Sequence, residues 1–382
     1  MLRAHQLRCA ALIGGYARTA EAQALVRSRW AHDLVAARPA VRTASPRIVA
    51  LDDSGFEQER DPAARTARLP SVALRTARTA LEAGTPVLVQ VPRRGYVPAL
   101  ACVRCRTIAR CRHCTGPLSL PDRDAAGAVC RWCGRDQPTL RCARCGSDGV
   151  RAIVVGARRT AEELGRAFPG ATVITSGGDA MVGEVSSGPA VVVATPGAEP
   201  VAEGGYGAAL LLDGWALLGR QDLRAAEDTL RRWMAACALV RPRGDGGAVA
   251  VVAESAIPTV QALIRWDPVG HAEAELDGRT EVGLPPAVHI AAVDGAPAAV
   301  NALLETAALA DDAVLLGPVD LPRGARRPPG APAEGPVHRM LVRVPRDGGL
   351  PLAAALRRAT AVLSARHDQE PVRVQIDPLH IG

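Results

Sequence analysis

Short apolar runs alternate with amphipathic segments through the middle of the chain. The runs at 87–91 and 190–194 are apolar almost throughout, which is typical of strands buried on both faces of a parallel sheet. Between such runs, apolar residues recur at helical spacing, as in 71–83. The alternation predicts helices covering a parallel sheet. Further strands are predicted at 150–155, 171–175, 208–212 and 248–252, and further helices at 221–239 and 257–265. Thr160 and Glu163 form a capping-box signal, which predicts another helix that begins there and ends near Phe168.

The two ends of the chain follow other patterns. Residues 1–45 predict a short strand at 10–13 and a helix at 19–30, like the end of another α/β unit, and the polar segment 52–69 predicts a surface linker. From about residue 270 the pattern predicts a small α+β domain. Its strands are predicted near 288–293, 314–319, 338–344 and 372–376, its helices near 297–309 and 351–364, and a mobile Pro/Arg/Gly loop at 322–335.

Composition narrows the chemistry that this chain can perform. A length of 382 residues allows two or three domains. All 46 basic residues counted as Lys+Arg are arginine, so a lysine Schiff base and the lysine of a phosphate-binding P-loop are excluded. The net charge of +7 and the pI of about 9.1 fit a partner with a phosphate backbone, although the charge is spread along the chain.

The compartment is predicted from apolar runs and cysteine usage. The chain has no apolar run of about 18 residues, so we expect no contact with a membrane. Eight of its ten cysteines follow a metal-binding pattern, whereas Cys9 and Cys237 lie apart from that pattern and from each other. This usage favours a cytoplasmic location.

Eight cysteines between residues 102 and 145 form four Cys-x2-Cys pairs. Each pair is a knuckle, a tight turn that directs two thiolates at one tetrahedral ion, so four knuckles predict two closed sites of four cysteines. Closed sites have no open position for water, which makes them structural rather than catalytic. The predicted ligands are Cys102, Cys105, Cys111, Cys114, Cys130, Cys133, Cys142 and Cys145.

Two pairings of these knuckles are possible. Neighbouring knuckles could share an ion in sequence order. In the nested arrangement, Cys102, Cys105, Cys142 and Cys145 hold one zinc ion, and the inner four cysteines hold the second. We favour the nested arrangement because it brings the ends of the insertion together and leaves room for a hairpin in the gap between Cys114 and Cys130. The remaining possibilities are disulfides or an iron–sulfur cluster, and His113 could replace a ligand.

The same segment is rich in arginine. Ten arginines lie between Arg104 and Arg151, against four acidic residues. They could form a basic surface for DNA or a partner protein, or they could only keep an arginine-rich protein in solution.

The cysteine spacing, preceded by Val-Pro-Arg-Arg-Gly-Tyr-Val-Pro-Ala-Leu at 91–100, resembles the PriA family of primosomal replication-restart helicases. In that family an Arg-Arg-Gly-aromatic stretch leads into a two-zinc insertion in the second helicase lobe. Further ordered matches extend the resemblance over nearly the whole chain. They are Leu-Leu-Asp at 211–213, Asp222, Arg224, Leu-Pro-Pro at 284–286, Leu-Gly-Pro at 316–318 and Ile-Asp-Pro at 376–378.

The resemblance implies a fold of class α/β, with helicase lobes of the RecA type. Residues 1–50 are then a remnant of the first lobe and 51–70 a linker. Residues 71–269 form a complete but degenerate second lobe with the zinc-binding insertion at 102–145, and 270–382 form a C-terminal α+β domain. Asp213, at a predicted strand end, is either a remnant of the family's site or a solvated loop residue.

Several motifs of the family are missing from this chain. No lysine is present for a Walker A motif, and Gly15-Tyr16-Ala17 stands where the family's Ser-Ala-Thr is expected. Ala-Thr-Pro at 194–196 and Ala-Glu-Gly at 202–204 replace the Gly-Thr-Gln and Lys-Gly stretches. The Gln-x2-Gly-Arg-x2-Arg motif falls on Ala235, Ala238, Leu239 and Pro242, with Arg241 and Arg243 nearby but out of register. We therefore expect no helicase activity and no catalytic residues, and we leave weak ATP binding open.

The leading hypothesis is a noncatalytic replication-restart protein with two zinc ions. It would bind branched or single-stranded DNA at stalled forks, with no DNA-contacting residue assigned, and would help to assemble the primosome and reload the replicative helicase. The resemblance implies the replicative helicase, other primosome proteins and single-stranded DNA-binding protein as partners. The alternatives are a 3′-5′ helicase whose N-terminal part is missing from this chain, and a zinc-ribbon scaffold that binds only proteins.

Overall fold

The largest unit of the structure is a parallel sheet. The computed structural model describes residues 6–51, 68–92, 100–105, 109–113, 118–119, 127–130, 135–152, 157–220, 222–321, 326–329, 335–365 and 370–381. Within these residues, six strands form this sheet in the order β1-β13-β12-β2-β10-β8, all parallel to their neighbours. They are β1 (Arg47–Leu51), β2 (Val87–Gln90), β8 (Thr172–Ser176), β10 (Ala190–Ala194), β12 (Ala208–Leu211) and β13 (Ala248–Glu254).

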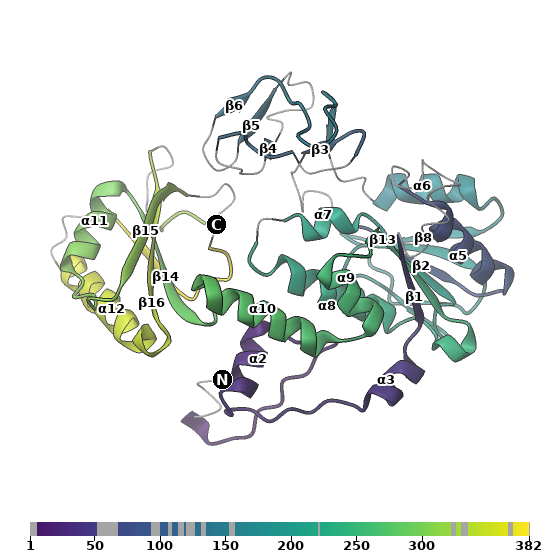
Figure 1. Cartoon of the computed structure of the whole chain (residues 1–382), viewed down its shortest axis with the longest axis horizontal. Helices are drawn as coiled ribbons and strands as arrows, with labels where there is room; N and C mark the ends of the chain where they lie inside the picture. The colour runs from purple at the N-terminus through teal and green to yellow at the C-terminus, as the bar shows by residue number, and fades with distance from the viewer. Residues whose placement is uncertain are drawn as a thin grey trace.

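Helices cover both faces of this sheet (Figure 1). On one face α5 (Ser71–Glu82) and α6 (Ala157–Ala167) pack on a core that includes Val87 and Val89, and on the other α8 (Ala225–Cys237) and α9 (Pro258–Arg265) pack on a core that includes Leu88. Successive strand residues point to opposite faces, so a strand covered on both sides must be apolar throughout. The predicted parallel sheet covered by helices is confirmed, except at one strand.

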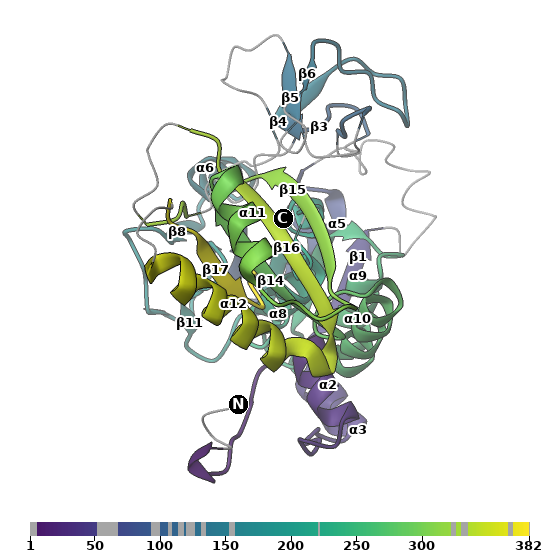
Figure 2. The ribbon, with the colours of Figure 1, turned by 90° about the vertical axis from the view of Figure 1, so that its left-hand side faces the viewer.

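The predicted strand at 150–155 belongs to the cysteine segment instead. Its described part, β7 (Val150–Ala152), pairs antiparallel with β3 (Leu100–Cys102), and residues 153–156 lie outside the described residues. The segment also contains the antiparallel strands β4 (Leu118–Ser119), β5 (Ala128–Cys130) and β6 (Asp136–Gln137). We call residues 100–152 the cysteine module; it projects from the rest of the chain in Figures 1 and 2. A second small pair, β9 (Glu184–Val185) with β11 (Val201–Ala202), is parallel.

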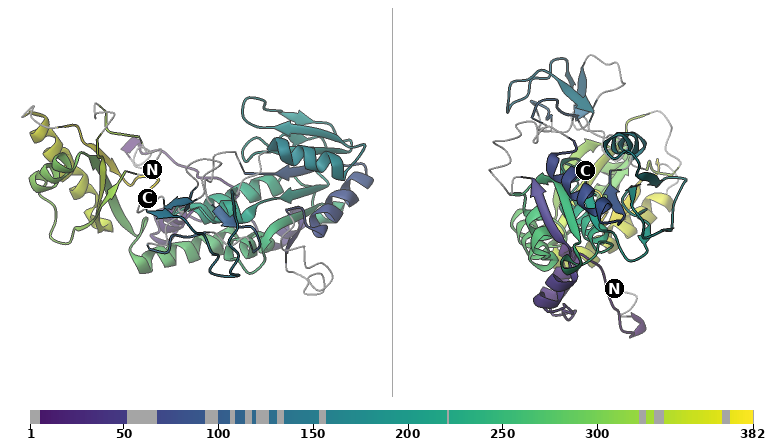
Figure 3. Two further views of the ribbon diagram at one scale, coloured as in Figure 1. Left: turned by 90° about the horizontal axis from the view of Figure 1, so that it is seen from above. Right: turned by 90° about the vertical axis from the view of Figure 1, so that its right-hand side faces the viewer.

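The C-terminal α+β prediction agrees closely with the structure. An antiparallel sheet in the order β15-β16-β14-β17 packs one face against two helices around a core of its own (Figure 2). The elements are β14 (Val288–Gly295), α11 (Pro297–Thr306), β15 (Val314–Asp320), β16 (His338–Pro345), α12 (Gly349–Ala365) and β17 (Arg373–Ile376). Figure 3 shows this domain, in yellow-green, at the opposite end of the long axis from the parallel sheet. Most of the predicted loop at 322–335 lies outside the described residues.

Two of the three predicted domain boundaries fall inside elements of the structure. The boundary at residue 50 falls inside β1, which pairs with β13 and so belongs to the parallel sheet rather than to a separate lobe. The boundary at 269–270 falls inside α10 (Pro268–Val282), a helix that the sequence patterns did not predict. This helix packs against α2 (Ala20–Arg27) through Leu276, Ala20 and Ala24. A further short helix, α3 (Arg38–Ala44), leads into β1.

Two local predictions were wrong, the strand at 10–13 and the helix start at Thr160. Residues 10–13 form no strand, and Leu12 and Ile13 are exposed. No strand among the described residues pairs with this segment. Thr160 does not begin a helix, since α6 begins at Ala157. Its buried hydroxyl instead accepts a hydrogen bond from Arg68. Residues 52–67 of the predicted linker lie outside the described residues.

Among the described residues, no helix is both long enough and apolar enough to span a membrane.

Candidate metal centre

Four cysteines converge at the base of the cysteine module. The Sγ atoms of Cys102, Cys105, Cys142 and Cys145 all lie within 4.8 Å of one another. Cys102 Sγ lies 3.5 Å from Cys145 Sγ, and Cys105 Sγ lies 3.4 Å from Cys142 Sγ. This is the grouping that the nested pairing requires and that pairing in sequence order does not.

The local backbone explains why these four side chains meet. The β3–β7 ribbon places Cys102 opposite Val150, and the Val103 amide continues the pairing by donating to the Gly149 carbonyl at 3.0 Å. A Cβ at Gly149 would lie 2.6 Å from a methyl carbon of Val103, so the close approach depends on glycine. In the fourth knuckle, Cys142 to Cys145, the Gly146 amide donates to the Cys142 carbonyl at 2.9 Å and closes the turn.

The donor set fits a tetrahedral metal ion. These two sulfur–sulfur separations are far longer than a disulfide bond of about 2.05 Å. They are close to the separation of about 3.8 Å that four Zn–S bonds of about 2.3 Å give in a tetrahedron. The Arg104 amide donates to Cys102 Sγ at 3.3 Å, a contact that favours the thiolate form needed for metal binding. The four cysteines can therefore hold one ion, with zinc as the ion that four thiolates suit best.

The structure describes two of the four inner cysteines, Cys111 and Cys130. Cys111 and Cys130 are both buried in one small cluster with Leu100, Leu118 and Ala128. The His113 amide donates to Cys111 Sγ at 3.4 Å, the same i+2 contact that Arg104 makes with Cys102. Cys114 and Cys133, the other two predicted ligands of the second ion, lie outside the described residues.

Two further predictions for this segment can be compared with the structure. A hairpin, β4–β5, does occupy the gap between the second and third knuckles. The ring Nδ1 of His113 lies 3.2 Å from an Arg135 guanidinium nitrogen and is not among the four groups that converge as possible metal ligands.

Arginines make the described surface of the module basic. Six of them are exposed, against the exposed acidic residues Asp136 and Asp148. Arg144 lies 3.8 Å from Glu254, at the carboxyl end of β13, and so connects the module to the parallel sheet. The six exposed arginines are Arg104, Arg110, Arg112, Arg135, Arg141 and Arg144.

Asp213 is neither solvated nor available to bind a ligand. It follows β12 in a left-handed conformation (φ 55°) and is only 2% exposed. Its carboxylate lies 3.0 Å from the Arg68 guanidinium, which also bonds Glu163 at 2.9 Å and Thr160 at 2.7 Å. The charge of Asp213 is thus neutralised inside the protein, and the residue fixes Arg68 against α6.

A pocket of about 1060 Å³ lies at the carboxyl end of β8 and is lined by residues of α6, β8 and the loop after β8. Crevices at this edge of parallel sheets commonly bind ligands. Thr195 lines the pocket and is 7% exposed, and its buried hydroxyl has no hydrogen-bond partner among the described residues. Arg158, from the first turn of α6, lies at the same pocket. The sequence patterns did not identify this site, since Thr195 was noted only within a missing helicase motif.

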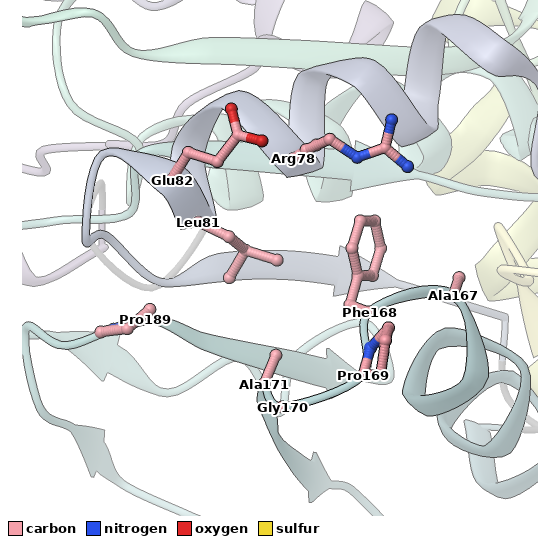
Figure 4. Close-up of a pocket in the computed structure, with 9 residues that line it drawn as sticks. All are labelled: Arg78, Leu81, Glu82, Ala167, Phe168, Pro169, Gly170, Ala171 and Pro189. Carbon is pink, nitrogen blue, oxygen red and sulfur yellow. The ribbon is translucent and has the colours of Figure 1, made fainter.

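A second pocket, of about 440 Å³, lies between the end of α5 and the loop that follows α6 (Figure 4). Leu81 and Phe168 project into the space, and Arg78 and Glu82 project from α5 beside it. The pocket contains no cysteine, and none of the predicted site residues lines it. We assign it no role.

The chain is therefore an α/β protein with an inserted cysteine metal module and a C-terminal α+β domain. A family model described as the primosomal protein N C-terminal domain matches residues 280–379. "Probable replication restart protein PriA" of Mycobacterium tuberculosis H37Rv is 74% identical over 389 residues, which cover 100% of this chain. The homologue of that name in Mycobacterium leprae is also 74% identical over the whole chain. "Replication restart protein PriA" of Haemophilus influenzae is 34% identical over 90 residues, 23% of this chain and 12% of its own length.

Along its whole length the chain is similar to these mycobacterial members of the PriA family. It spans 59% of the length of the mycobacterial relatives named above. The family resemblance predicted from the cysteine spacing is thus confirmed.

Proposed function

We propose that this protein binds branched DNA at stalled replication forks and promotes primosome assembly without unwinding DNA itself. The observation that carries the proposal is identity of 74% along the whole chain to proteins named for replication restart. Because the chain spans 59% of their length, fork binding by this chain alone also rests on the features of the described residues given below.

The parallel sheet is proposed to be a RecA-like lobe that has lost its catalytic role. Asp213, the acidic residue at the carboxyl edge that was a candidate remnant of a nucleotide site, is committed to Arg68. Arg241, near the expected arginine-finger motif, donates to the Gly204 carbonyl at 2.8 Å. Phosphoryl transfer depends on a lysine and arginine fingers placed at the γ-phosphate, and the sequence supplies neither in register.

The cysteine module is proposed to hold two zinc ions and to contact duplex DNA at the fork. Four converging thiolates support the first ion, and the buried Cys111 and Cys130 support the second. The exposed arginines of the module suit phosphate oxygens, which arginine binds in a bidentate manner.

The pocket beside Thr195 is proposed to contact the single-stranded arm of the fork. The Thr195 hydroxyl is itself buried, so a phosphate oxygen in this pocket would be held by Arg158 rather than by that hydroxyl. The Arg158 side chain is exposed at the same pocket and can neutralise the charge of that phosphate. It also lies 3.7 Å from Glu162.

The first test compares affinity for a synthetic fork with affinity for duplex and single strand of equal length, across a salt series. We expect the fork to bind at least about tenfold more tightly, with a salt slope set by the number of phosphates contacted. Equal affinities for the three DNAs would overturn fork recognition. If no DNA binds at all, the protein-binding scaffold takes its place as the better hypothesis, and the primosome proteins become the ligands to test. DNA-stimulated ATP hydrolysis by this chain would contradict the noncatalytic assignment.

Two variants on α6 test the single-strand contact. Arg158→Ala removes a proposed phosphate contact, so single-strand affinity should fall several-fold and the salt slope should drop by about one. Arg166→Ala is the matched control, because Arg166 is exposed on the same helix about 12 Å further along. Equal effects of the two substitutions would show that only general charge matters.

A further inference from the structure

The last described residues of the chain cross from the C-terminal domain to the parallel-sheet domain. His380 Nδ1 lies 2.9 Å from Asp222 Oδ2, and Arg224 donates to the Leu379 carbonyl at 2.9 Å. Asp222 and Arg224 belong to the loop that precedes α8. We call residues 377–381 the C-terminal strap.

The strap is firmly attached to its own domain. Asp377 turns the chain after β17 with φ 47°. Its carboxylate accepts one hydrogen bond from the Ile290 amide and lies 2.7 Å from His289 Nδ1. Pro378 is buried. Arg339 donates to the His380 carbonyl at 3.3 Å while its guanidinium is paired with the fully buried Asp294.

The loop at 222–224 is held from two other directions. Arg224 pairs with Glu21 of α2 at 2.6 Å. Arg279 of α10 donates to the Leu223 carbonyl at 3.1 Å and forms a buried ion pair with Glu227. The loop therefore joins the N-terminal helix, the linking helix α10 and the strap at one place.

The contacts on the two sides of this loop differ in strength. Arg279 and Glu227 are both 3% exposed, so separating them would leave a buried charge without its partner. The His380 side chain is 73% exposed, and exposed ion pairs contribute little to stability. The strap can therefore separate from the 222–224 loop while the buried contacts of that loop stay in place.

We propose that the C-terminal strap is a releasable clamp that fixes the C-terminal domain against the parallel-sheet domain. When the strap leaves the 222–224 loop, the domain pivots in the segment between α10 and β14. That segment begins at Gly283, which ends α10 with φ 66° and can change its backbone conformation at little steric cost.

The docked clamp sets the distance between the C-terminal sheet and the cysteine module. A rigid branched DNA can meet both surfaces at once only if that distance is fixed, so release should weaken fork binding more than binding of flexible single strands. This consequence rests on the proposed function, whereas the clamp itself can be measured without DNA.

Hydrogen exchange and solution scattering of the whole chain test the clamp. In Arg224→Ala combined with His380→Ala, we expect exchange of the Gly283, Leu284 and Ala287 amides, in the segment where the domain pivots, to rise at least about tenfold and the maximum dimension in solution to increase. Glu21→Ala is the matched control, because it removes the Arg224 contact to α2 but leaves the bonds to the strap. It should leave both readouts near those of the unaltered protein.

Unchanged exchange and dimensions in the double variant would overturn the proposal. If that variant does not fold, His380→Ala alone decides, since its exposed side chain makes no core contact. Faster exchange confined to the segment 283–287 would support the clamp, and unchanged exchange would contradict it. If the clamp opens but fork affinity stays the same, only the link to fork binding fails.

Discussion

The parallel-sheet domain and the cysteine module are stabilised in different ways. The sheet domain buries two large apolar clusters, one on each face, with Trp233, Tyr206 and many Leu and Val side chains inside. The described part of the module buries one small cluster in which two of the five fully buried members are cysteines. A core of that size does not offset the entropy of ordering the segment, so we propose that metal binding supplies the difference. On this proposal one region folds by burial of apolar side chains, and the other depends on metal coordination.

Metal removal should separate the two regions most clearly. Each closed zinc site is worth about 10 kcal/mol of local folding, so a chelator or Cys105→Ser should unfold the module and leave the sheet domain folded. Hydrogen exchange would show rapid exchange confined to 100–152, and elemental analysis would show zinc loss. Cys9→Ser, which alters an exposed cysteine outside the module, should change neither measurement. Unfolding of the whole chain on chelation would contradict the division.

One substitution made in both cores should have different effects. Leu88→Ala opens a cavity between the sheet and its helices and should cost roughly 2–5 kcal/mol of global stability while zinc content stays the same. Leu118→Ala alters the module cluster and should leave the main thermal transition in place. It should instead raise the zinc concentration needed to protect 100–152 from exchange. A shared loss of the main transition would show that the two regions fold as one unit.

Acid should act on the sheet domain through one buried histidine. Burial between α9 and α10, near Thr259, lowers the pKa of His271 below its ordinary value of 6.5. The unfolded chain then binds the proton more readily, so stability should be complete above pH 6.5 and should fall as the pH drops below it. His271→Asn should flatten this dependence in chemical denaturation between pH 7 and 5. Zinc release from protonated thiolates is a separate acid effect, and the variant should not change it.

The cysteine spacing and the apolar patterns determined a large part of this protein. Knuckle geometry is local, because two residues between cysteines fix a tight turn whatever surrounds it. The sequence therefore predicted the ligand set, of which four members converge in the structure. Strands apolar on both faces, such as 190–194, were predictable for a similar reason, since only burial between helices explains such a run.

Tertiary structure alone decided which partners these segments found. Nothing in residues 47–51 indicated pairing with β13, two hundred residues away, because strand order depends on the whole packed sheet. The pattern at 150–152 predicts a strand of the buried parallel sheet. The segment instead pairs with β3, because this pairing brings the four cysteines of the cluster together. Asp213 reads as a solvated or ligand-binding residue until Arg68, distant in sequence, neutralises it. Local pattern fixes the kind of element, whereas long-range contacts between charges, strands and thiolates fix its neighbours.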